Sequence, residues 1–433
     1  MNQNKSYTLS LIIITFIFFV FGFIIWLNGV LIPYFQICLE LTNFQASLVI
    51  FAANIAYFVM ALPSAWVLKK TKYKKGMVLG LLIMTIGTLM FIPAAYTRTY
   101  SLFLTGLFVT GTGLTLLQAA VNPYIAILGP IESTAQRVGF LGLANKTAGI
   151  LSIMVLGSIF LLNADEIIAN VSTLSGLEKA KILDEYALKI VNPYIAITLI
   201  LLLMATVIHF SNLPEIDDSK TEIEGKSVDI ESRESVFQYP YLVLGVVTMF
   251  FASTCEVVPV DSIIIYSRAL GLSINEARIF PIYALVAMLM GYLATIIFIP
   301  KYISQHKTLQ FTALWGILLS LGSYFTECKT SIFLVSLMGF GTAMLWGTLW
   351  GLSLRGLGKY TKIGGAMLLM GIIGGAILPL LFGKLVDTNP QNPQNPQNAI
   401  LLMIPFYLVI LGYGIWGYKL ENWNSKSIQH ITK

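Results

Sequence analysis

Three ionisable side chains stand inside long apolar stretches of this sequence. Lys146 lies in R-V-G-F-L-G-L-A-N-K-T-A-G-I-L, and Glu256 and Asp261 lie in F-F-A-S-T-C-E-V-V-P-V-D-S-I. A charge at the centre of a lipid bilayer costs roughly 2.5–3.5 kcal/mol on insertion scales, so such residues usually mark a functional pathway and pair with one another. We expect Lys146 to pair with Glu256 or Asp261, or else to extend toward the membrane surface.

Amides and flat aromatic rings accompany these charges. Gln118 and Asn122 are four residues apart and share a helix face, and amides both donate and accept hydrogen bonds. A sugar offers alternating donors and acceptors on its rim and an apolar C–H face that stacks on indole rings. The residues that match this chemistry are predicted to bind substrate: Gln118, Asn122, Asn28, Glu256, Trp350 and Trp346. For the asparagines and these two tryptophans, helix packing remains an equal alternative.

The composition places these residues in a polytopic membrane protein. The chain has 433 residues, of which 56% are hydrophobic and 11% charged, whereas soluble domains carry about 25% charged residues. The three cysteines show no disulfide or metal spacing, and no catalytic or cofactor motif is recognisable. The net charge of +6 comes from loops such as Lys69–Lys75, which is the pattern of cytoplasmic loops and not of nucleic-acid binding.

Apolar runs of the length that crosses a bilayer recur along the whole chain. We predict twelve spans, near 8–36, 43–68, 76–96, 100–127, 137–162, 190–211, 239–270, 275–299, 308–326, 331–355, 363–386 and 399–419. Basic residues gather in the loops on one side, so we expect both termini in the cytoplasm and a multi-pass protein of the inner (plasma) membrane.

A charged stretch divides the spans into two groups of six. Residues 211–234 are polar and poor in aromatics, so we predict halves at 1–211 and 239–433 with a cytoplasmic linker at 212–238. The second span of each half begins with a similar sequence, at Leu41–Ala46 and at Leu272–Ala277. Parallel six-helix repeats are typical of the major facilitator architecture. The predicted fold is therefore an all-α membrane protein with two pseudo-symmetric six-helix halves.

Several motifs resemble a known family. L-N-G-V-L-I-P-Y-F (27–35), L-T-N-F-Q-A-S-L (41–48) and L-L-Q-A-A-V-N-P-Y (116–124) resemble the fucose:proton symporter family of the major facilitator superfamily. F-G-F-I-I-W-L-N-G, N-K-T-A-G (145–149), S-T-C-E-V-V (253–258) and R-G-L-G-K (355–359) are similar to its bacterial N-acetylglucosamine permease branch. The resemblance implies a sugar transporter and covers nearly the whole chain.

The sequence departs from this family at two acidic positions. Fucose symporters carry an aspartate where this chain has Gly29 and a glutamate where it has Gln118. Their coupling mechanism therefore does not carry over, and Lys146, Glu256 and Asp261 are the remaining ionisable candidates for coupling to a proton. Sodium coupling stays open, because Asn145 and the two acids could supply oxygen ligands.

The expected function is secondary active import of a sugar, either N-acetylglucosamine or a hexose such as glucose, by alternating access. We expect symport with H⁺ or Na⁺, no cofactor, no nucleic-acid partner, and a monomer surrounded by membrane lipids. Two alternatives remain, which are a sugar uniporter and a non-transporting membrane sugar sensor. A membrane-embedded enzyme is disfavoured because no catalytic motif is present.

Overall fold

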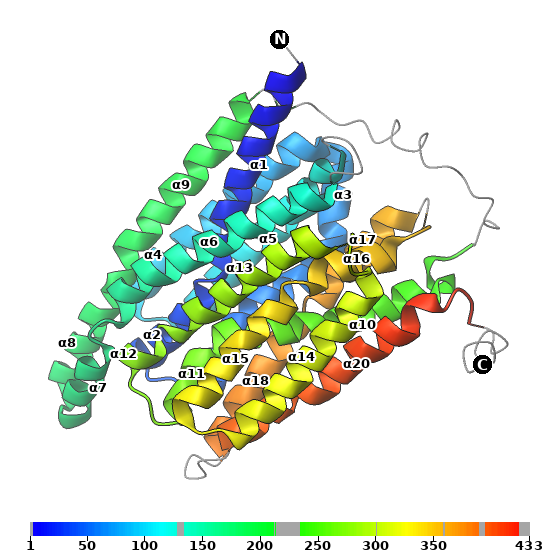
Figure 1. The fold of residues 1–433 in the computed structure, drawn as a ribbon. Helices are drawn as coiled ribbons and strands as arrows, with labels where there is room; N and C mark the ends of the chain where they lie inside the picture. Colours follow the sequence, from blue (N-terminus) through cyan, green and yellow to red (C-terminus); the bar gives the residue numbers. More distant parts are fainter. Residues whose placement is uncertain are drawn as a thin grey trace.

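The computed structural model describes residues 3–127, 134–211, 213, 234–299, 301–357, 360–388 and 395–423. These residues form a bundle of long helices that lie side by side (Figure 1). The expected linker at 212–238 falls mostly outside the described residues, so the boundaries of the two halves stay a prediction.

The first six spans, with the loop between the fifth and the sixth, contain nine α-helices in the described residues. The helices are α1 (Gln3–Ile25), α2 (Asn28–Cys38), α3 (Asn43–Leu89), α4 (Phe91–Thr97), α5 (Tyr100–Ile127), α6 (Thr134–Leu161), α7 (Ala164–Thr173), α8 (Gly176–Ala187) and α9 (Val191–Phe210). The first span breaks at Trp26, between α1 and α2. Inside α3, Lys72 has φ 61°, a left-handed value that turns the chain between the second and third spans.

The last six spans are interrupted more often. They comprise α10 (Pro240–Val257), the π-helix η5 (Val258–Ser262), α11 (Ile263–Ala269), α12 (Ile274–Ala277), α13 (Phe280–Phe298), α14 (Gln305–Phe325), α15 (Cys328–Thr342), α16 (Leu345–Leu354), α17 (Thr361–Gly371), α18 (Gly374–Thr388), α19 (Asn395–Leu401) and α20 (Met403–Ile415). Pro259 lies in η5 and lacks the backbone N–H that a regular helical hydrogen-bond ladder needs, so the seventh span is interrupted there.

Each of the twelve expected spans has a helical counterpart in the described residues. By length and hydropathy, ten segments qualify as membrane spans there. The difference of two has a physical reason. Asn43–Thr97 is counted as one segment of 55 residues although it contains two spans, and α14 is long enough but more polar than the others.

The same helix pairings occur in both groups of six. Helix α1 packs against α6 as α10 packs against α18, which pairs the first span with the fifth in each group. Helix α3 packs against α5 as α13 packs against α15, and α3 against α9 as α14 against α20. This repeated packing is the arrangement of two similar six-helix halves that the sequence predicts.

The two halves meet along several helix pairs. Helix α6 packs against α13, and α3 packs against α17 and α18. At the end of the bundle where α7 and α12 lie, α2 also contacts η5 and α11, and α7 contacts α12 (Figure 1). We call this the α7–α12 end. The halves are therefore in contact at this end.

Candidate functional site

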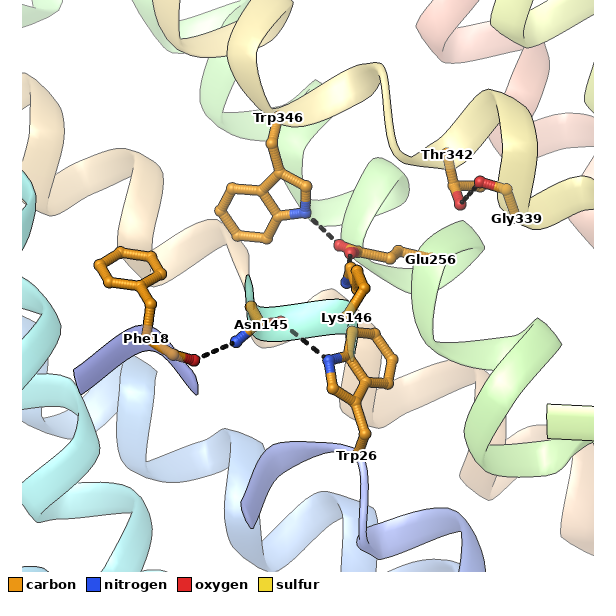
Figure 2. Close-up of polar contacts among 8 residues, drawn as sticks. All are labelled: Phe18, Trp26, Asn145, Lys146, Glu256, Gly339, Thr342 and Trp346. Atoms are coloured by element: carbon orange, nitrogen blue, oxygen red, sulfur yellow. Dashed lines mark hydrogen bonds and ion pairs between the residues drawn. The ribbon is translucent and has the colours of Figure 1, made fainter. Parts of the chain in front are cut away.

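Lys146 forms an ion pair with Glu256 between the two halves. Lys146 lies on α6 and Glu256 on α10, and the Lys146 Nζ lies 2.9 Å from the Glu256 Oε1 (Figure 2). The residues are only 3% and 6% exposed. The structure thus selects Glu256 from the partners that the sequence left open for Lys146, and it does not show Lys146 extending to the surface.

Two indole rings support this pair. The Lys146 Nζ lies 3.6 Å from the centre of the Trp26 ring, a cation–π contact. The Trp346 Nε1 donates a hydrogen bond to the Glu256 Oε2 (Figure 2). The ring of Tyr292 on α13 lies 5.9 Å from the same ammonium group. A buried ion pair needs such additional partners because desolvation can exceed the Coulombic attraction.

Asn145 positions Trp26. Its Oδ1 accepts a hydrogen bond from the Trp26 Nε1 at 2.9 Å, and its Nδ2 donates to the Phe18 carbonyl oxygen at 3.2 Å (Figure 2). Both ends of the amide are therefore used within the first six spans. This geometry gives Asn145 a positioning role and does not favour the sodium-ligand role that the sequence left open for it.

Gln118 and Asn122 lie on α5 and are half-buried. The Gln118 Nε2 donates to the Tyr57 hydroxyl of α3 at 3.2 Å, which leaves its carbonyl oxygen to accept from another group. Within the described part of the chain, the Asn122 amide makes no hydrogen bond. Asn28 is buried and begins α2. These amides therefore retain hydrogen-bonding capacity for a polar ligand.

Trp346 and Trp350 lie on one side of α16, next to open space at Gly347. A Cβ added to Gly347 would meet nothing within 4 Å, and Gly347 is exposed. The edge of the Trp350 ring lies 3.5 Å from the corresponding position on Gly365 of α17. Both tryptophans are half-buried. An open space beside two indole rings is the surface that the apolar face of a sugar requires.

Asp261 stands apart from the pair. It lies in η5, is 3% exposed, and its Oδ1 is buried with no hydrogen-bond partner in the described residues. It faces Gly29 of α2, since a Cβ on Gly29 would lie 3.5 Å from the Asp261 Oδ1. The two acids of this span therefore have different surroundings. Glu256 is in an ion pair, whereas Asp261 has one buried oxygen that accepts no hydrogen bond from the described residues.

Some residues of the site were not predicted from the sequence. Tyr57 and Tyr292 contact site residues from α3 and α13, but a tyrosine within an apolar span gives no signal of its own. Among the described residues, no group of three or more His, Cys, Asp or Glu side chains could hold a metal ion.

At the α7–α12 end, one carboxylate joins the halves. The Asp165 Oδ1 accepts from the Ile274 backbone N–H at 3.0 Å, and its Oδ2 accepts from the Asn275 N–H at 3.1 Å. Asp165 lies on α7 and thereby caps the start of α12. Such caps satisfy backbone donors that have no partner within the helix. Opening this end would require both hydrogen bonds to break.

Comparison with known proteins agrees with this architecture. The family model of the Major Facilitator Superfamily matches residues 14–379. A glucose/galactose transporter of Brucella abortus biovar 1 (strain 9-941) is 32% identical over 426 residues, which covers 96% of each chain. The L-fucose-proton symporter of Escherichia coli (strain K12) is 27% identical over 388 residues, covering 89% of this chain and 88% of that protein.

A crystal structure of the E. coli fucose:proton symporter, determined for a variant of that protein, superposes with a TM-score of 0.72, at 25% identity, over 95% of this chain and 99% of that one. These relatives support the expected resemblance to fucose:proton symporters. They are named for glucose, galactose and fucose, so the N-acetylglucosamine branch that the motifs suggested stays a prediction.

Proposed function

This chain belongs to the Major Facilitator Superfamily, and we propose that it imports a hexose into a bacterial cell by alternating access, in symport with a cation. The observation that carries this proposal is the buried Lys146–Glu256 pair between the halves. An ion pair that bridges the moving parts of a carrier can form in one state and separate in another. The relatives of this chain are sugar transporters, so the chain belongs among transporters and not among enzymes.

The sugar is proposed to bind beside this pair. Glu256 would accept hydrogen bonds from sugar hydroxyls, and Gln118 and Asn122 would bind others from α5. Trp346 and Trp350 would stack on the apolar face of the ring, and Asn28 would close the site from α2. A hydroxyl that hydrogen-bonds to Glu256 competes with Lys146 and Trp346 for the same two oxygens. Sugar binding thereby weakens a contact between the halves, which is the differential interaction that a ligand needs to shift a conformational equilibrium.

The proposed substrate class is a neutral hexose, with glucose and galactose first. Relatives named for these sugars cover 96% of the chain, and the site offers a carboxylate, several amides and indole rings. N-acetylglucosamine is the second candidate. The branch motifs favour it, and the open space over Gly347 could hold an acetamido group.

The α7–α12 end is proposed to face outward. The basic cluster at Lys69–Lys75 follows the second span at the opposite end, and such clusters stay in the cytoplasm. Both termini would then be cytoplasmic, and the chain would work as a monomer in the inner membrane. In this orientation the structure is closed on its outer side by α2, η5, α7 and α12.

Coupling is proposed to use a proton and the ionisable groups Lys146, Glu256 and Asp261. A relative named as an L-fucose-proton symporter supports the choice of H⁺ over Na⁺. Asn145, the amide that a sodium site would have used, is already bonded to Trp26 and Phe18. A uniporter or a sugar sensor would need no proton movement, and a sensor would also show no exchange.

Counterflow of labelled sugar in proteoliposomes tests the proposal. Purified protein would be reconstituted in vesicles loaded with unlabelled glucose, galactose, fucose or N-acetylglucosamine. Vesicles that contain the protein but no sugar are the control. We expect transient accumulation of labelled glucose or galactose. The rate of exchange with each loaded sugar ranks the four sugars as substrates. The absence of exchange with every one of these sugars would overturn the proposal.

A further inference from the structure

We propose that Asp261 is the carboxyl group that binds the coupling proton, and that its burial against Gly29 links proton uptake to closure of the outer side. This inference rests on the proposed function, since it presumes a carrier that alternates between two states. It assigns to Asp261 a task separate from that of Glu256, which is already engaged by Lys146 and Trp346.

The contact between α2 and η5 is unusually close. A Cβ on Gly29 would lie 3.0 Å from the Val260 carbonyl oxygen and 3.3 Å from the Asp261 Cα. These distances are at the limit that real side chains tolerate, so the approach depends on glycine at position 29. The contact joins the first and seventh spans and therefore the two halves. Asp261 is buried at this junction because the junction is closed.

The closed junction suits a neutral carboxyl group better than a carboxylate. The Asp261 Oδ1 is buried and accepts no hydrogen bond from any described residue. The Gly29 backbone N–H favours the carboxylate, but an ionised group with a buried oxygen that lacks a donor still bears a large cost of desolvation. A protonated carboxyl group carries no charge and gains an O–H donor. Closure and protonation therefore favour each other. By linkage, opening the junction to external water favours loss of the proton.

The charges around Asp261 do not remove this preference. Lys146 attracts the Asp261 carboxylate and Glu256 repels it, and these two are paired with each other. Helices α2 and α13, which pack on η5, contain no Asp, Glu, Lys, Arg or His. Of the other neighbours of η5, α11 bears Arg268, α15 bears Lys329, and α18 bears Lys384 and Asp387. All four residues lie toward the helix ends at the α7–α12 end of the bundle.

The proton and the sugar then cross the membrane together. With the outer side open, Asp261 exchanges protons with external water, and closure of the junction selects its protonated form. The protonated side chain permits α2 to close on η5 with the sugar bound. After the inner side opens and the sugar leaves, water that enters from the cytoplasm reaches Asp261 and takes the proton. The ionised side chain then favours reopening of the junction to the outward-facing state. One proton and one sugar thus move inward together.

The variant Asp261→Asn tests this assignment, because asparagine has nearly the same shape and does not titrate. Counterflow and sugar-induced proton uptake would be measured in the same proteoliposomes, the latter with a pH-sensitive dye in the external medium. We expect the variant to retain counterflow, to lose sugar-induced proton uptake, and to accumulate sugar only to equilibrium. Asp184→Asn is the matched control, since Asp184 is an acid of α8 that pairs with Arg98 within one half.

The outcomes separate the two proposals. Proton uptake by Asp261→Asn at the wild-type level would overturn the assignment, and so would wild-type accumulation driven by a sodium gradient without proton movement. Absence of counterflow in the wild-type protein would instead overturn the proposed function.

Gly29→Ala provides a second test should Asp261→Asn fail to fold. The added methyl group holds the junction open, so protonation of Asp261 is less favourable and the midpoint of proton uptake moves to lower pH. An unchanged midpoint together with normal counterflow would contradict the link between closure and protonation.

Discussion

Lys146 on α6 and Glu256 on α10 form a buried ion pair that joins the two halves, with 2.9 Å between the Lys146 Nζ and the Glu256 Oε1. Trp26 covers the ammonium group, and Trp346 donates to the second carboxylate oxygen. The pair is therefore held by residues from both halves. Under the proposed alternating-access mechanism, the strength of this pair in each conformational state determines how readily the carrier changes state.

Removal of one partner of this pair should destabilise the protein more than removal of both. Glu256→Gln leaves the Lys146 charge buried without a counter-ion, and such changes cost about 3–5 kcal/mol, whereas neutral replacement of both partners is often tolerated. We expect the melting temperature in detergent to fall in Glu256→Gln and to recover largely in Lys146→Met/Glu256→Gln.

Glu276→Gln is the control for this series, because it breaks an exposed pair with Lys329 and should leave the melting temperature unchanged. Equal melting temperatures of the wild-type and Glu256→Gln proteins would show that the buried pair contributes no net stability.

Trp346→Phe should strengthen sugar binding while it preserves an aromatic ring on α16. Phenylalanine cannot donate to the Glu256 Oε2, so a sugar hydroxyl no longer has to displace a hydrogen bond to a charged group. Such a bond contributes about 1.5–3 kcal/mol, and we expect the Kd for the transported sugar to fall roughly tenfold or more. Binding of labelled sugar to the purified protein measures this. Trp416→Phe, at an exposed ring beyond the end of α20, should bind sugar as the wild type does; equal affinities of the two variants would remove Trp346 from the site.

Gln118→Ala and Asn122→Ala should each reduce sugar affinity by about 1 kcal/mol, or roughly fivefold, because each removes one hydrogen bond to a sugar hydroxyl. Tyr57→Phe is the matched control. It deletes only the hydroxyl that accepts from the Gln118 Nε2, so its effect on affinity should be smaller. A loss of affinity in Tyr57→Phe that exceeds the loss in Gln118→Ala would indicate that Gln118 serves helix packing.

Asp165→Ala should make the outer side open more often. The change removes two hydrogen bonds from α7 to the start of α12, and a loss of about 1–2 kcal/mol corresponds to a roughly five- to thirtyfold shift in population. A cysteine at position 47 reports on this, since Ser47 is buried and a Cβ on Gly383 of α18 would lie 2.6 Å from its hydroxyl.

The reporter would be Ser47→Cys with Cys328→Ser, because Cys328 is exposed and the other two cysteines are buried. A membrane-impermeant maleimide applied from outside should label Asp165→Ala faster than its parent. Asp184→Ala, which breaks a contact within one half, should label at the parent rate. Equal labelling of all three proteins would show that the cap of α12 does not hold the outer side closed.

The positions of the spans could be predicted from the sequence because the bilayer imposes a fixed length of apolar residues. The same constraint makes Lys146 conspicuous, and it limits its partners to the acids of a span with comparable depth. Choosing between Glu256 and Asp261 needed the structure, since these acids are five residues apart in sequence and differ only in what faces them.

The rest depends on contacts between helices that are distant in sequence. Gly29 and Asp261 lie together because α2 crosses η5, and nothing in either segment indicates the other. Asn145 bonds to Trp26 and Phe18 instead of pointing toward an ion. Asp165 on the loop helix α7 caps a helix of the other half. In the sequence, nothing distinguishes Asp165 from the other acids of that loop. Periodicity and hydropathy carry no information on such pairings.

The most direct test of the central claim compares counterflow of labelled hexose by the wild-type and Glu256→Gln proteins in the same proteoliposome preparation. If the Lys146–Glu256 pair is the sugar-sensitive contact between the halves, the wild type exchanges hexose, and the variant, reconstituted in equal amount and shown to be folded, exchanges it at least roughly tenfold more slowly, the effect of losing about 1.4 kcal/mol. Exchange at the wild-type rate by Glu256→Gln would contradict the account, because it would leave the buried pair without a part in transport.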